Sequence, residues 1–250
     1  MASTPIPAAA VEPQASISPV GRIVGVVLSP KSTFADIARK PSWLLPVILL
    51  AVLGAVVAVA LNQKMDWRGY MSQQIEKSPR AGALSAEQKQ QQIEAGAKFA
   101  PISAYVFGIP APLVVVLTVA GVMLGAYNLM AGANINYKTA LAIVSHAFVP
   151  AMLGNLLFLL VLFLKPAGTF DLENPVATNV AVFLPEGSAK WLEALAKNID
   201  ILAIWITLLI AVGFAAANPK RLPGNRSFNI AFGVFAVYIV IRMGLAFVLS

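Results

Sequence analysis

The sequence predicts an all-α membrane protein, a bundle of five transmembrane helices with short interfacial helices. Of 250 residues, 58% are hydrophobic and 12% charged, whereas a soluble domain has about 45–50% and about 25%. Five apolar stretches also reach the length of about 20 residues that crosses a bilayer. The predicted spans are about 42–62, 102–130, 140–164, 199–217 and 227–249. Soluble core helices would need a polar shell for which this chain has no residues.

The first two spans carry the marks of membrane helices. Trp43 stands at the entrance of the uncharged first span as an interfacial aromatic. Pro110 and Pro112 should kink or restart the second span, because proline lacks a backbone donor. Small residues follow a four-residue spacing, which permits close helix approach and a homo-oligomer. They are Gly54 and Ala58 in the first span and Gly121 and Gly125 in the second.

The segments outside the spans are predicted to be a tail and short helices. Residues 1–19 are rich in Pro, Ala and Ser and are expected to be flexible. Residues 20–41 are expected to be a cytoplasmic amphipathic segment, with Phe34, Ile37 and Ala38 facing the membrane. Ser85 and Gln88 form a capping box, which predicts a polar helix leading into the second span.

The basic residues indicate an orientation. With the N-terminus inside, the cytoplasmic pieces hold eight basic and two acidic residues, and the other side holds nine of each. The basic density at 220–226 favours a cytoplasmic N-terminus and an outer C-terminus. In a bacterium the membrane would be the plasma (inner) membrane. Four basic residues are the candidate contacts for anionic lipid headgroups or a partner: Arg39, Lys40, Lys220 and Arg221.

Four polar residues of the spans are candidate functional positions, because ionisable groups in a membrane are costly. His146 could relay protons or bind a ligand, but a neutral imidazole bonded to a neighbouring helix is the favoured interpretation. Asn155 is interpreted as a hydrogen-bonding contact between helices. Asp200 and Arg242 both fall in the outer half, where an ion pair is geometrically possible.

The residue inventory predicts neither an enzyme nor a cofactor or metal site. The chain has no cysteine and one histidine, which excludes thiolate and all-histidine metal sites within one chain. It has no HExxH, GxSxG or Walker-type sequence. Ser145 and His146 are neighbours and would point about 100° apart on a helix, so they cannot form a nucleophile–base pair. Nucleic-acid binding is not expected either, since the basic residues flank the membrane.

Three motifs in order resemble the Yip (Ypt-interacting) family, especially its prokaryotic members. SP-x-x-x-F at Ser29–Phe34 precedes P-x-W-L-x-P at Pro41–Pro46. His146 and Pro150 follow in the third span, and Asp200 and Trp205 open the fourth. The resemblance covers about Val20 to the C-terminus. It implies five transmembrane helices with a cytosolic N-terminus and, in eukaryotes, vesicle trafficking and binding of prenylated GTPases. It transfers no catalytic residue.

Two functions therefore remain open from the sequence. The leading hypothesis is a non-enzymatic scaffold that organises the bilayer or binds another membrane or peripheral protein through its basic cytoplasmic segments. The alternative is a small-solute or ion transporter that uses His146, Asn155 and the Asp200–Arg242 pair. A wet cavity reaching His146 would favour transport, and tight packing around it would favour a scaffold.

Overall fold

The computed structural model describes residues 16–78, 81–165, 172, 174–185 and 187–248. Within these ranges the regular secondary structure consists of α-helices and two short 3₁₀ turns, joined by loops, and no strand is formed. The all-α prediction is confirmed. Most of the predicted tail, residues 1–15, lies outside the described residues.

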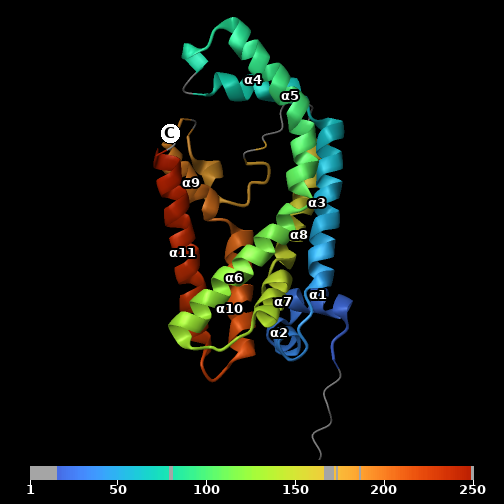
Figure 1. Cartoon of the computed structure of the whole chain (residues 1–250), viewed down its shortest axis with the longest axis vertical. Helices are drawn as coiled ribbons and strands as arrows, with labels where there is room; N and C mark the ends of the chain where they lie inside the picture. The colour runs from blue at the N-terminus through green and yellow to red at the C-terminus, as the bar shows by residue number, and fades with distance from the viewer. Residues whose placement is uncertain (1–15, 79–80, 166–171, 173, 186, 249–250) are drawn as a thin grey trace, which may run out of the picture.

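The long helices run between two ends of an elongated molecule (Figure 1). α3 (Leu44–Lys64), α7 (Tyr137–Ala147) with α8 (Val149–Leu164), and α11 (Gly224–Val248) run in one direction. α5 (Ala86–Gly108) with α6 (Ala111–Ala131), and α10 (Ile201–Ala217), run back. Successive long segments therefore alternate in direction, as expected for a multi-pass membrane protein.

Four helical segments of the described chain are long and apolar enough to cross a membrane: Leu44–Lys64, Ala111–Ala131, Tyr137–Leu164 and Gly224–Val248. α10 is strongly apolar but has 17 residues, which is short for a span. Large apolar side chains on α11, such as Val240 and Leu245, are exposed. Such a surface suits lipid rather than water, so the chain is an integral multi-pass membrane protein.

The predicted second span, 102–130, is two helices instead of one kinked helix. α5 starts in the polar segment at Ala86, with both hydrogen bonds of the Ser85–Gln88 capping box present. It ends at Gly108, and α6 begins at Ala111 in a different direction (Figure 1). Pro110 and Pro112 cause this break, because neither ring nitrogen can donate to the preceding turn. The third span is likewise interrupted at Phe148, two residues before Pro150.

The apolar face of the expected membrane-surface helix packs against other helices of the protein. α1 (Pro19–Leu28) and α2 (Pro30–Arg39) fold back on each other beside α7 and α10 (Figure 1). The side chains of Phe34 and Ile37 are fully buried in the main hydrophobic core. Their face therefore contacts other helices, and the membrane-facing interpretation was wrong. The outward apolar face of this segment belongs to α1, where Val20, Val24 and Leu28 are exposed.

A glycine lets α2 approach α10. A Cβ atom at Gly213 would lie 2.3 Å from Ile143 Cγ2 and 2.9 Å from Phe34 Cδ1. No side chain larger than hydrogen fits there without a shift of α2 or α7. The tight contact fixes α1 and α2 against the bundle at this end.

The other end of the molecule is built from short polar helices. α4 (Trp67–Glu76), the 3₁₀ turn η1 (Ala81–Ala83) and the start of α5 project beyond the bundle (Figure 1). The 3₁₀ turn η2 (Val180–Phe183) and α9 (Lys190–Asn198) lead into α10, and α9 packs on α11. We call this the opposite end, in contrast to the end that holds α1 and α2.

Candidate functional site

The described residues at one end of the bundle expose charge of a single sign. This end is formed by α1, α2, the α6–α7 connection and the α10–α11 loop, and we call it the basic end (Figure 1). Its exposed cations are Lys31, Arg39, Lys40, Lys138, Lys220, Arg221 and Arg226. Among the described residues of this end the one acid is Asp36, which is buried. The surface is therefore electropositive.

Hydrogen bonds hold the two loops of the basic end together. Arg226 donates from Nη2 to the carbonyl oxygen of Met130 at 2.9 Å. Asn218 donates to the carbonyl oxygen of Ala133 at 2.8 Å. Asn128 closes the α6–α7 connection by bonding both the N–H and the carbonyl of Ile135 at 2.9 Å. The α6–α7 connection and the α10–α11 loop thus form one surface despite about 90 residues between them in the chain.

The four predicted contact residues all lie on this surface. Arg39, Lys40, Lys220 and Arg221 are exposed, and the fold brings the two pairs to the same end of the molecule. Arg39 reaches the Asp36 carboxylate at 3.4 Å while its side chain stays 52% exposed. Two cationic pairs that are about 180 residues apart in the chain therefore share one surface.

A buried ion pair lies beneath the basic end. Arg22 Nη2 and Nε lie 2.8 and 2.9 Å from Asp36 Oδ2, and both side chains are at most 5% exposed. Arg22 also donates from Nη1 to the carbonyl oxygen of Lys40 at 2.9 Å and to Ser42 Oγ at 2.8 Å. One guanidinium thus links α1, α2 and the start of the first span. This pair was not predicted from the sequence. Arg22 and Asp36 are 14 residues apart and come into contact only because α1 folds back onto α2.

His146 is enclosed by protein. Its Nδ1 lies 2.8 Å from the carbonyl oxygen of Ala142, one turn earlier in the same helix, and its side chain is buried. The expected partner on a neighbouring helix is thus replaced by its own helix. His146 is not among the residues that line the described cavity.

The Asp200–Arg242 ion pair is not formed in the described part of the chain. Asp200 instead caps α10, where its Oδ1 accepts from the backbone N–H groups of Leu202 and Ala203 at 2.8 and 3.0 Å. Its Oδ2 accepts from the Thr178 hydroxyl. Arg242 is exposed on the outer face of α11. An N-cap role explains why an acid stands at this position.

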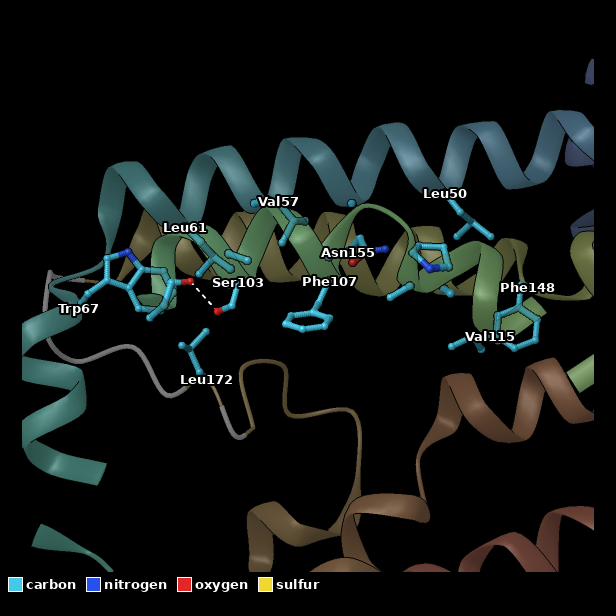
Figure 2. A pocket seen from close by; sticks show the side chains of 18 of the residues that line it. Leu50, Val57, Leu61, Trp67, Ser103, Phe107, Val115, Phe148, Asn155 and Leu172 are labelled. Carbon is cyan, nitrogen blue, oxygen red and sulfur yellow. Dashed lines mark hydrogen bonds between the residues drawn. The ribbon is translucent and has the colours of Figure 1, made fainter. Parts of the chain in front are cut away.

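An apolar groove of about 690 Å³ lies beside α3, α5, α6 and α8. Figure 2 shows side chains from these helices around it, with Trp67 at one end and Phe148 at the other. Asn155 lies between these ends. The predicted bond from Asn155 to another helix is absent: its side chain has no hydrogen-bond partner in the part of the chain that the structure describes. Sequence reasoning placed Asn155 in a span but had no means of finding the groove.

No group of three or more His, Asp or Glu side chains that could hold a metal ion occurs among the described residues. The basic end and the groove are two features of the described chain that could contact another molecule. One offers a cationic surface, and the other offers an apolar recess within the transmembrane part.

The fold and these features define an all-α, multi-pass integral membrane protein with one basic end. The Yip1 domain family model matches residues 24–245, so the chain belongs to the Yip family. Members of this family are generally non-enzymatic membrane proteins. No curated protein and no solved structure matches the sequence.

Proposed function

We propose that this protein is a non-enzymatic membrane-organising scaffold whose basic end faces the cytoplasm and contacts anionic lipid headgroups and a membrane or peripheral protein partner. The observation that carries the proposal is the basic end itself. Seven exposed cations gather there, and the single acid of the described part of that end is buried. Each basic residue near an anionic surface contributes about 1 kcal/mol to attraction.

The proposed topology has five membrane crossings, with α10 as the fifth and shortest. α1 and the C-terminal part of α11 lie at different ends of the molecule (Figure 1), which supports an inner N-terminus and an outer C-terminus. Basic flanks mark the cytoplasmic side of membrane proteins, and the basic end contains α1 and α2. In a bacterium this arrangement would place the protein in the plasma membrane.

Charge neutralisation tests the proposal. A variant with Arg39, Lys40, Lys220 and Arg221 changed to Gln would be reconstituted in phosphatidylcholine nanodiscs that contain one part in ten of phosphatidylglycerol. We expect phosphatidylglycerol retained with the protein after detergent extraction to fall by at least about tenfold. Four lost charges at about 1 kcal/mol each set an upper limit of roughly 1,000-fold if their contributions add fully. Proteins recovered with the variant from native membranes should be depleted in parallel.

The matched control removes four lysines at the opposite end: Lys77, Lys89, Lys98 and Lys165. Their change to Gln alters the net charge by the same amount but leaves the basic end intact. Equal loss of phosphatidylglycerol from the two variants would contradict the proposal, because net charge alone would then explain retention. Unchanged retention and unchanged protein recovery in the basic-end variant would also refute it.

A further inference from the structure

The apolar groove contains a single polar side chain without a partner among the described residues. Four polar side chains line it, and three are satisfied within the protein. Trp67 donates to Asn62 at 3.1 Å, Ser103 donates to the carbonyl oxygen of Ala100 at 2.8 Å, and Tyr70 also has a partner. The remaining one is the amide of Asn155. An amide that lacks a hydrogen bond in an apolar surrounding is unfavourable. A polar group of a bound molecule would therefore stabilise the Asn155 side chain.

The position of Asn155 sets the depth of that group. Asn155 precedes the end of α8 at Leu164 by nine residues, or about 14 Å along a helix. A bilayer hydrocarbon core is about 30 Å thick, so Asn155 lies near its middle. Figure 2 shows it midway along the groove, between Trp67 and Ser103 at one end and Val115 and Phe148 at the other. A molecule bound there would have hydrocarbon on both sides of its polar group.

The side chains that line the groove also disfavour a bound molecule with a charged group. No Asp, Glu, Lys, Arg or His stands among its described lining residues. A phosphate or ammonium headgroup placed at the depth of Asn155 would therefore lie in the hydrocarbon layer without a counter-charge from these described residues, which is strongly unfavourable. The volume of about 690 Å³ falls within the range of roughly 300–1,000 Å³ usual for small-molecule sites.

From these observations we infer that the groove binds one neutral lipid, whose uncharged carbonyl or hydroxyl group hydrogen-bonds to Asn155 while its hydrocarbon contacts the apolar walls. The break at Pro110 creates the recess, because α6 departs from the line of α5 there. Gly54 fixes the neighbouring wall: a Cβ atom there would lie 2.9 Å from the carbonyl oxygen of Gly108, so α3 and α5 touch at this point. The groove is thus a product of the two helices that the prolines separate.

Paired photoreactive lipids test this inference. The protein would be reconstituted in phosphatidylcholine vesicles with a diacylglycerol, or a phosphatidylglycerol, that carries the same diazirine in one acyl chain. Labelling of peptides that contain Phe107 and Val115 would be normalised to labelling of the lipid-exposed face of α11. We expect the diacylglycerol to label the groove about fivefold more than the phosphatidylglycerol does. The charged phosphate holds the carbonyls of phosphatidylglycerol near the membrane surface, so only the diacylglycerol brings a carbonyl or hydroxyl to the depth of Asn155, and one net hydrogen bond corresponds to about that factor.

Two variants separate hydrogen bonding from shape. Asn155→Leu removes the amide at similar size, and it should abolish the preference for the diacylglycerol. Asn229→Leu is the matched control, since Asn229 is an exposed residue of α11 outside the groove, and it should preserve that preference. Ala104→Phe fills part of the groove and should lower its labelling by both probes while Asn155 remains.

Each outcome decides for or against the neutral lipid. Equal labelling by the two probes, or a preference for the phosphatidylglycerol, would overturn it. A diacylglycerol preference that survives in Asn155→Leu would show that the amide is not the recognising group. Unchanged labelling in Ala104→Phe would show that the probe reacts outside the groove. Elution of each variant as a single species identical to the wild type ensures that the comparison concerns folded protein.

Discussion

The two ends of this protein use charge in contrasting ways. At the basic end, the Arg22–Asp36 pair is buried at 2.8 Å, and the exposed charges of its described residues are all positive. At the opposite end, Arg68 and Glu94 lie 3.6 Å apart with side chains 63% and 62% exposed. Acids and bases alternate there along α4, α5 and α9. The basic end thus combines a packed interior with a one-sign surface, whereas the opposite end is a solvated, mixed-charge surface.

This contrast indicates which end of the protein contributes most to its folding stability. A buried ion pair is destabilised severely by loss of one partner, whereas an exposed pair contributes little. Aromatic packing follows the same division. The rings of Tyr127 and Phe214 stack with centroids 4.1 Å apart near the basic end. We therefore expect substitutions at the basic end to affect folding most, and the predictions below run from the largest expected effect to the smallest.

Arg22→Met should have the largest effect. It leaves the Asp36 carboxylate buried without its principal cation and removes the bonds to Lys40 and Ser42. Loss of one partner of a buried pair costs about 3–5 kcal/mol. The free energy of unfolding, measured by denaturant titration in detergent micelles with tryptophan fluorescence as the signal, should fall by that amount.

The double variant Arg22→Met with Asp36→Leu sharpens this result. Because it removes both charges, it should be more stable than Arg22→Met alone. A loss below about 1 kcal/mol in the single variant, the range of an exposed pair, would mean that the two ends do not differ in the way described.

Gly213→Ala should have the next largest effect. The added methyl group would lie within 2.9 Å of atoms of both Ile143 and Phe34, so α2 must shift. Overpacking of this kind costs about 1–3 kcal/mol. The same titration measures it, and thermal unfolding should show a lower Tm.

Gly121→Ala is the matched control for that substitution. Nothing lies within 4 Å of a Cβ atom at Gly121, and alanine favours a helix by about 1 kcal/mol over glycine. We expect no loss of stability. An equal loss at the two glycines would indicate that helix propensity or lipid contact, rather than the contact of α2 with α10, decides the outcome.

Tyr127→Phe should have a smaller effect. The Tyr127 hydroxyl donates to the carbonyl oxygen of Ser227 at 2.8 Å, and Ser227 Oγ donates to Ala211 at 2.6 Å, so the chain of bonds joins α6, α11 and α10. Removing one hydroxyl while retaining the ring should cost about 1 kcal/mol. Tyr238→Phe, on the exposed face of α11, should leave the unfolding curve unchanged. If the two variants behaved alike, the buried chain of bonds would not stabilise this end.

Much of the fold could be predicted from the sequence because its signal is local. Runs of apolar residues placed 42–62 close to α3, 199–217 close to α10 and 227–249 close to α11. Pro110 and Pro112 also correctly predicted an interruption of the second span. The sequence could not tell whether Pro110 and Pro112 bend one helix or separate two, because the outcome depends on which neighbours accept the redirected α6.

The candidate site was less predictable because it depends on contacts between distant segments. Amphipathicity correctly grouped Phe34 with Ile37, but periodicity does not reveal whether an apolar face meets lipid or protein. The glycine that admits Phe34 stands at position 213, in another span. Asp200 and Arg242 were paired on depth alone, whereas the actual partner of Asp200 is Thr178 in the preceding loop. Pairing by depth ignores the direction in which each side chain leaves its helix.

Arg68→Ala should have the smallest effect and is the decisive check on the opposite end. Its ion pair with Glu94 is long and exposed, so salt and water screen it, and pairs of this kind contribute about 0–1 kcal/mol. We expect a change in the free energy of unfolding of a few tenths of a kcal/mol, which vanishes in high salt. A loss comparable to that of Arg22→Met would show that α4 and α5 depend on charge pairing as strongly as α1 and α2. The opposite end would then have to be regarded as a second structural centre rather than a solvated extension of the bundle.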